Sequence, residues 1–310
     1  YIPAKSDTTI VIGAHYDHLG WGAEGSRYTG SEKMIHNGAD DNASGTAAVM
    51  ELARYFVSRN DQLKHSLLFC AFSGEESGLL GSNYFSKNMT INPHTVRMMI
   101  NFDMVGRLKD QESGLAVFGV GTTAEFGEYF KTVDTTDLKI VMKEPGTGPS
   151  DHTSFYNQNI PVLHFFTGAH NDYHKPSDDV EFIDIPGTHK VIHFAAETIE
   201  HFDQLEKELA FQKTVDPNAG RMSSSFSVTL GVMPDYIAEV KGMRIDGVSS
   251  NRPAERAGLK AGDVLIEMGG MPVTDIYDYM GCLSKFRLHD TTKVVVQRGE
   301  EKLTLTVIFE

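Results

Sequence analysis

The sequence predicts an α/β protein, in which a mixed, mostly parallel β-sheet flanked by helices is followed by a smaller domain of short strands. Two observations predict the first part. Apolar runs of strand length alternate with helical patterns over about two thirds of the 310 residues, which is typical of a sheet covered by helices. Glycine-flanked strings that contain acidic or histidine residues stand at the ends of successive runs. From residue 226 onward, short apolar runs alternate with turns, which predicts a second domain.

The elements of the first part follow from the apolar pattern. Strands are expected at 8–15, 66–73, 96–105, 115–121, 139–144 and 160–166, and helices at 44–60 and 78–88. A long helix is expected over 187–209, where the apolar residues that recur at helical spacing are Val191, Ile192, Ala195, Ile199 and Phe202. The second part is expected to hold five short strands and two helices, the helices at 253–258 and 275–286.

A change of composition marks the expected domain boundary. Residues 210–225 lose the helical periodicity and collect proline, glycine and serine. The sequence therefore predicts a first domain over 1–209, a linker over 210–225 and a second domain over 226–310.

Composition excludes several classes of function. The chain is 40% hydrophobic, and its apolar stretches are far shorter than the roughly 18 residues that a membrane-spanning helix needs, so no span is predicted. A net charge of −14 makes nucleic acid and anionic membranes poor partners. Cys70 and Cys282 give no sign of a disulfide framework. The chain opens at Tyr1 without a visible signal peptide, which is typical of a trimmed or mature form.

Six side chains of the metal-ligand type stand at the ends of strands or in nearby turns. They are His15, Asp40, Glu75, Glu76, Asp103 and His174. Loops converge beyond the carboxyl ends of the strands in an open α/β sheet, so we expect these side chains to meet there. Four carboxylates in one pocket cannot all stay ionised unless a cation offsets their repulsion. The sequence therefore predicts a metal centre.

The donor types indicate which metal this centre holds. Carboxylate and imidazole ligands without a nearby cysteine favour zinc, with cobalt or manganese as alternatives, over calcium or an iron–sulfur cluster. Two divalent ions about 3.5–4 Å apart, bridged by a carboxylate and a water, form a known hydrolytic device. Any one of these residues has an ordinary structural explanation, such as a core histidine for His15 or a helix cap for Asp40. Their order and their small-residue surroundings carry the prediction.

Several strings resemble those of the M28 zinc peptidases, which include leucyl-type and S-like aminopeptidases. The strings are GAHYDH, GADDNASG, FSGEESGLLGS, NFDMVG, SDHTSF and HKPSDD, in the family's order, and the resemblance covers roughly residues 8–205. It implies the zinc-exopeptidase fold for the first domain.

The resemblance also implies a role for each matching residue. Asp40 is expected to bridge two zinc ions, with His15 and Asp103 at one and Glu76 and His174 at the other. Glu75 is expected to act as the general base, and Asp17 to orient the imidazole of His15 from behind. The family's cis non-proline peptide bond is expected between Asp40 and Asp41.

The implied activity is that of an aminopeptidase. Glu75 would take a proton from a water held at the metals and deliver it to the leaving amine. One metal would polarise the scissile carbonyl, while the other would hold the free α-amino group of the substrate. The expected substrates are therefore peptides with a free amino terminus.

The last 85 residues resemble a PDZ domain of the bacterial protease type, which implies a small barrel-like β fold. The strings that carry this resemblance are NRPAERAGLKAGDVLIEMGGMPV and TLGVMPDY. A PDZ domain adds an extended peptide to a sheet edge and captures the terminal carboxylate with loop amides. Leu230, Gly231 and Val232 are expected to form that loop. Peptide tethering and packing against the catalytic domain are both open readings of the domain's role.

Two other functions remain as alternatives. A glutaminyl-cyclase-like aminoacyltransferase shares the fold and uses one zinc, but the complete GADDNASG string together with His15 argues against a one-metal enzyme. A non-catalytic protein that binds peptides through its PDZ domain is the other alternative, although no expected ligand is missing. Family resemblance alone favours a periplasmic or extracellular location.

Overall fold

A computed structural model describes residues 1–22, 25–110, 114–214, 228–235, 238, 240–248 and 251–309, without the side chains of residues 110, 233 and 277. The chain divides into two compact units. The first comprises residues 1–26, 33–168 and 174–216, and the second comprises residues 27–32, 169–173 and 217–310. Most of the expected linker, residues 215–225, lies outside the described residues, so its limits stay a prediction.

The first unit is built on one sheet of six strands in the order β2, β1, β3, β6, β4, β5. The strands are β1 (Thr9–His15), β2 (Ser66–Phe72), β3 (Val96–Phe102), β4 (Leu115–Phe118), β5 (Ile140–Lys143) and β6 (Val162–Phe166). β4 runs antiparallel to β6, whereas the other neighbouring pairs are parallel. The mixed, mostly parallel sheet that the sequence predicts is therefore confirmed.

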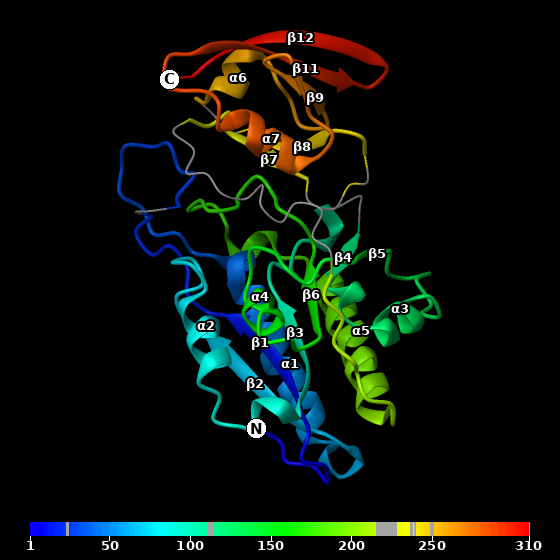
Figure 1. The fold of residues 1–310 in the computed structure, drawn as a ribbon. Coiled ribbons are helices and arrows are strands. Elements are labelled where there is room, and N and C mark those ends of the chain that lie inside the picture. Colours follow the sequence, from blue (N-terminus) through cyan, green and yellow to red (C-terminus); the bar gives the residue numbers. More distant parts are fainter. Residues whose placement is uncertain are drawn as a thin grey trace. The chain divides into compact units, whose positions relative to one another are not determined.

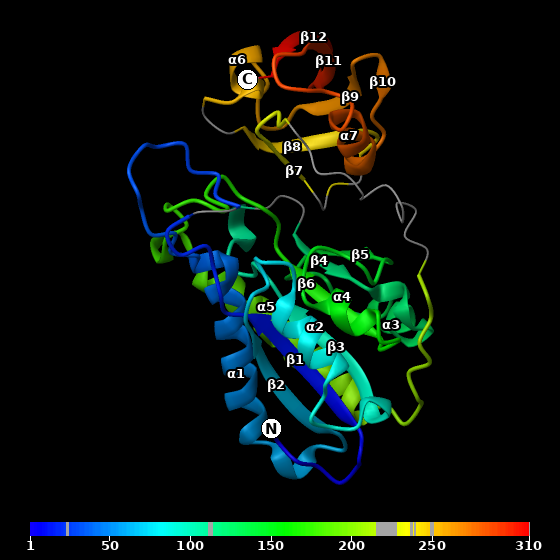
Figure 2. The same ribbon diagram turned by 60° about the vertical axis from the view of Figure 1, so that its left-hand side comes forward.

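Among the described residues of the first unit, the helices beside this sheet (Figure 1) are α1 (Gly45–Val57), α2 (Leu80–Lys87), α3 (Ala124–Phe130), α4 (His152–Tyr156) and α5 (Ile185–Gln204). Single helical turns lie at Asn60–Gln62, Pro93–Thr95, Leu108–Asp110, Val120–Thr122 and Val180–Phe182, and a tight turn at Ala39–Ser44 precedes α1. Figure 2 shows α2 and α4 together on one face of the sheet, and α1 and α5 contact each other on the other face.

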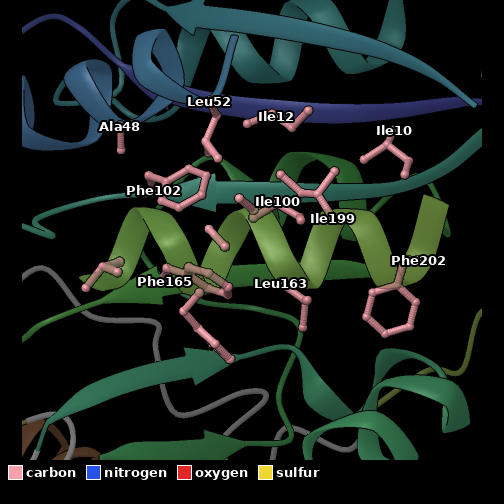
Figure 3. Packing of buried hydrophobic residues seen from close by; sticks show 14 of the residues in the cluster. Ile10, Ile12, Ala48, Leu52, Ile100, Phe102, Leu163, Phe165, Ile199 and Phe202 are labelled. Atoms are coloured by element: carbon pink, nitrogen blue, oxygen red, sulfur yellow. The ribbon is translucent and has the colours of Figure 1, made fainter. Parts of the chain in front are cut away.

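Side chains alternate between two apolar layers, as they must along a strand that is buried on both faces. Ile10 and Ile12 of β1 belong to the larger cluster, whereas Val11 belongs to a smaller cluster on the opposite face. Figure 3 shows Leu52 of α1 and Ile199 of α5 in the larger cluster. Each central strand is thus buried on both faces, which holds its carboxyl end in a fixed position.

The last helix of the first unit is shorter than its sequence pattern predicts. α5 ends at Gln204, and Leu205 already has an extended backbone. Arg97 of β3 donates hydrogen bonds to the carbonyl oxygens of Phe202, Leu205 and Lys207 at 3.2, 2.7 and 2.6 Å. These hydrogen bonds provide donors for carbonyl groups at and beyond the helix end, which lies about one turn earlier than expected.

The second unit contains an antiparallel sheet with the strand order β12, β11, β9, β8, β7, and β10 pairs with β9. Its strands are β7 (Val232–Pro234), β8 (Met243–Val248), β9 (Val264–Met268), β10 (Met271–Pro272), β11 (Thr291–Arg298) and β12 (Glu301–Ile308), and its helices are α6 (Pro253–Ala257) and α7 (Ile276–Leu283). Asp263 is buried and accepts hydrogen bonds from Nε and Nη2 of Arg298 at 2.7 and 2.8 Å. This paired contact ties the start of β9 to the end of β11.

Within the described ranges, none of the helices combines the length and the apolar character that crossing a lipid bilayer requires.

The packing of α1 predicts a sharp contrast between two of its residues. Leu52 is fully buried, so Leu52→Ala should lower the free energy of unfolding by about 2–5 kcal/mol through lost burial and the cavity that remains. Met50 in the same helix is 66% exposed, and Met50→Ala should change that free energy by less than about 0.5 kcal/mol. Urea denaturation of both variants measures the difference, and equal losses would contradict this packing.

Candidate metal centre

The ends of three parallel strands bring the ligand-type side chains together. His15 is the last residue of β1, Asp103 follows β3 directly, and Glu75 comes three residues after β2. β1 lies between β2 and β3 and is parallel to both, so all three carboxyl ends lie at one edge of the sheet. His174, in the segment that follows β6, reaches the same group of side chains.

The first group of donors surrounds His15, whose side chain is only 1% exposed. Its Nε2 atom lies 3.4 Å from Oδ1 of Asp103 and 3.5 Å from Oδ1 of Asp41. Ligand atoms of His15, Glu75 and Asp103 all lie within 4.8 Å of one another. One imidazole and several carboxylates therefore face a common point, which is the donor set that zinc accepts.

The second group of donors surrounds His174. Its Nε2 atom lies 3.1 Å from Oε2 of Glu76 and 3.2 Å from Oδ2 of Asp41. The two oxygens of Asp41 thus face two different histidines, since Oδ1 is the oxygen near His15. A carboxylate in this position is suited to bridge two cations.

The structure places Asp41, and not Asp40 as the sequence suggests, between the two histidines. Oδ1 of Asp40 instead accepts a hydrogen bond from the Gly106 amide at 2.7 Å. The amides of both aspartates donate to Oδ2 of Asp178, at 2.9 and 3.0 Å, which fixes the turn that sends the two side chains in different directions. The cis peptide bond also lies one residue later than expected, between Asp41 and Asn42.

Asp17 supports the site in a different way from the one expected. Its main-chain oxygen, 3.1 Å from Nδ1 of His15, is the close contact to that ring, whereas its carboxylate is 3.8 Å away. The carboxylate accepts hydrogen bonds from the amides of Glu75 and Glu76 at 3.1 and 3.4 Å. Asp17 therefore orients the histidine through its backbone and holds the glutamate turn through its side chain.

Sequence reasoning missed His18, which also belongs to the site. Its Nδ1 atom lies 2.8 Å from Oε1 of Glu76, and ligand atoms of His18, Asp41 and Glu76 lie within 4.8 Å of one another. The available signal was the second histidine of GAHYDH, three residues after His15. Ser150, which donates to Oδ2 of Asp103 at 2.8 Å, was also not assigned a role.

The negative charge of the pocket acts on both facing histidines. Burial by itself would lower the pKa of His15, but the charges of Asp103 and Asp41 outweigh it and raise that pKa to about 11. Burial would also lower the pKa of His174, but its hydrogen bonds to Asp41 and Glu76 outweigh that effect and raise the pKa to about 10. The carboxylates thus stabilise a positive charge on His15 and His174. Divalent cations would meet the same demand, with the histidines deprotonated as ligands.

The adjacent glutamates differ strongly in their affinity for a proton. Burial, followed by the charge of Asp103, raises the pKa of Glu75 to about 9. Burial also disfavours the charged form of Glu76, but hydrogen bonds from His174 and His18 lower its pKa to about 2. Two neighbouring carboxyl groups with such different environments are suited to proton transfer in one case and to cation binding in the other.

The expected carboxylate-binding loop lies in the second unit. Leu230 is buried, and its carbonyl oxygen accepts a hydrogen bond from the Ala254 amide at 2.8 Å. Gly231 has a φ of +75°, and its amide donates to Oγ1 of Thr229 at 3.0 Å. Val232 begins β7. The Gly231 amide therefore has a hydrogen-bond partner within the loop. Carboxylate capture by these residues stays a prediction.

Sequence comparison supports both domains. The profile of peptidase family M28 matches residues 1–199, and that of the PDZ domain matches residues 220–309. A probable leucine aminopeptidase of Trichophyton verrucosum is 33% identical over 169 residues, which amount to 52% of this chain and 42% of that relative. The match therefore spans less than half of the relative's length.

Solved structures with the same fold include enzymes of two classes. BSAP, a zinc aminopeptidase from Bacillus subtilis, has a TM-score of 0.51 and 22% identity, with 66% of this chain and 49% of that chain covered. A glutaminyl cyclase of Bacteroides thetaiotaomicron has a TM-score of 0.53 and 21% identity, with 63% and 74% covered. At these identities the likeness shows the fold alone. Because the family profile matches more than half of the residues, the chain belongs to peptidase family M28, and a PDZ domain follows its peptidase region.

Proposed function

We propose that the first unit is a two-zinc aminopeptidase, which removes amino-terminal residues from peptides. The observation that carries this proposal is the position of Asp41, whose Oδ1 lies 3.5 Å from Nε2 of His15 and whose Oδ2 lies 3.2 Å from Nε2 of His174. One carboxylate thus joins two sets of donors, each with its own histidine and a further carboxylate. A one-metal enzyme does not require this arrangement.

The donor set fits zinc. His15, Asp41 and Asp103 would hold one ion, and His174, Asp41 and Glu76 the other; the donors are nitrogen and oxygen atoms, with no thiolate. Cobalt and manganese accept the same ligands and can substitute. When bound, the two ions would supply Lewis-acid polarisation of the scissile carbonyl and a site for the free α-amino group.

Glu75 would carry the proton in this reaction. It lies beside His15 and Asp103, where burial and the charge of Asp103 raise its pKa to about 9. Bound cations would lower this pKa and leave the carboxylate ionised, so that it can accept a proton. As a general base it would accept a proton from the attacking water, and as a general acid it would return that proton to the leaving amine. Asp17 would keep Glu75 in place through the hydrogen bond to its amide.

The PDZ domain implies that the second unit binds peptides. We propose that it binds the carboxyl-terminal ends of peptides. Two roles of the domain remain as alternatives, the tethering of substrates and packing against the peptidase region. The family resemblance also leads us to propose a periplasmic or extracellular location, which cell fractionation would test.

The amino-terminal requirement provides the first test. Zinc-loaded protein should cleave a peptide with a free amino terminus and leave its acetylated counterpart intact, because acetylation removes the group that the second ion would hold. A chelator should abolish the cleavage, and added zinc should restore it. Chromatography of the products measures both effects. If neither peptide is cut over a range of first residues, while zinc is bound, the glutaminyl-cyclase-like or the non-catalytic alternative is favoured.

Glu75 provides a test of the proton-transfer step. Glu75→Gln should lower kcat by about 10²–10⁴-fold, because the amide cannot accept the proton. Both metals should remain bound, since this side chain is not assigned to either set of ligands. Kinetics and metal analysis on the same preparation separate the two properties. A variant that keeps more than about a tenth of the activity would exclude this role.

The neighbouring aspartates provide a matched pair for the metal centre. Asp41→Asn should lose at least one of the two metals, because a neutral amide cannot supply two anionic oxygens to a bridge. Asp40→Asn should keep both, since that side chain bonds to the Gly106 amide. Zinc per chain, measured after dialysis at a fixed free-zinc concentration, distinguishes the variants. The reverse pattern would restore the sequence-based assignment of Asp40.

A further inference from the structure

His18 contacts one of the proposed ligands directly and has so far no part in the reaction. Its side chain is 9% exposed, and its Nδ1 atom lies 2.8 Å from Oε1 of Glu76. The other oxygen of the same carboxylate, Oε2, lies 3.1 Å from Nε2 of His174. Glu76 is therefore held between two imidazoles, one at each oxygen.

The distances indicate which group the His18 ring holds. Its Nδ1 atom is 3.8 Å from Oδ2 of Asp41, which is too far for a hydrogen bond, whereas 2.8 Å to Glu76 is an ordinary hydrogen-bond length. With a proton on Nδ1, His18 donates to Oε1 and leaves Oε2 directed toward His174 and Asp41. Rotation of the Glu76 carboxylate would break this contact.

The surroundings of His18 restrict the ring itself. A Cβ atom at Gly38, where φ is +63°, would lie 2.6 Å from Cγ of His18, so the backbone of that turn packs against the ring. The His174 ring lies edge-on at a centroid distance of 5.8 Å, and the His36 ring is 6.5 Å away. A ring packed in this way can impose a direction on a flexible glutamate side chain.

We propose that His18 is a positioning residue for the second metal, which acts by holding the Glu76 carboxylate through Nδ1. The inference rests on the proposed two-metal function and adds a determinant of affinity to it. A glutamate has three side-chain torsions to fix when it binds a cation, and a hydrogen bond that already fixes them reduces that cost. Partners of this kind contribute about 10–100-fold to metal affinity in other sites.

Three substitutions of His18 test where the hydrogen bond originates. In His18→Asn the side-chain amide nitrogen takes nearly the position of Nδ1 and can donate to Glu76. In His18→Gln the amide lies near the position of Nε2, and in His18→Ala no donor remains. We therefore expect the affinity for the second zinc to fall about 10–100-fold in the Ala and Gln variants and to stay close to the unmodified value in the Asn variant.

The measurement is zinc affinity, by competition with a chelating dye on the full chain, with the absorption spectrum of the cobalt-substituted protein as a second readout. The spectrum of His18→Asn should match that of the unmodified chain, because the ligands themselves do not change. His193→Ala is the matched control. It removes an imidazole that lies 3.7 Å from Oε2 of Glu197 in an exposed pair on α5, and it should leave both affinities unchanged.

Two results would overturn the inference. If His18→Ala binds the second zinc as tightly as the unmodified chain does, His18 does not position Glu76. If His18→Asn loses as much affinity as His18→Ala and its cobalt spectrum changes, the ring is itself a ligand. The unmodified chain tests the underlying function separately, because binding of one zinc per chain would reject the two-metal proposal before any variant is compared.

Discussion

The contact on which the candidate centre depends is the carboxylate of Asp41, with one oxygen toward His15 and the other toward His174. Without it, the pocket would contain two separate pairs of an imidazole and a carboxylate. Neighbouring groups hold this carboxylate in place through its backbone. The Asp178 carboxylate accepts a hydrogen bond from the Asp41 amide. The Asn42 side chain donates a hydrogen bond to the carbonyl of Phe102 at the end of β3. The Asp41 turn is thus fixed to the sheet on one side and to the segment that carries His174 on the other.

The scaffold explains how so much negative charge can occupy one place. Parallel strands buried on both faces deliver His15 and Asp103 to one edge, and the large apolar clusters cannot shift to relieve the repulsion there. The charge is instead met locally, by imidazoles whose pKa the carboxylates raise and by hydrogen bonds from Ser150 and main-chain amides. A cation bound at the same position would be favoured for the same reason.

The site contains two pairs of adjacent acidic residues whose side chains have different surroundings. Glu75 and Glu76 share one turn, held by Asp17, yet the first has a raised pKa and the second a lowered one because their side chains meet different neighbours. Asp40 and Asp41 share another turn, and one bonds to an amide while the other faces two histidines. In both pairs the chemical role depends on the direction in which the backbone projects the side chain.

The sequence by itself determined the α/β class, the mostly parallel sheet and the family, because strand periodicity and the short strings around His15, Glu75 and Asp103 are local properties. It also indicated a carboxylate and imidazole centre, since the residue types follow successive strand ends. Only the tertiary structure placed Asp41, rather than Asp40, between the two histidines, ended α5 at Gln204, and brought His18 to Glu76 across 58 positions of sequence. These outcomes depend on packing between distant segments, which local patterns in the sequence do not determine.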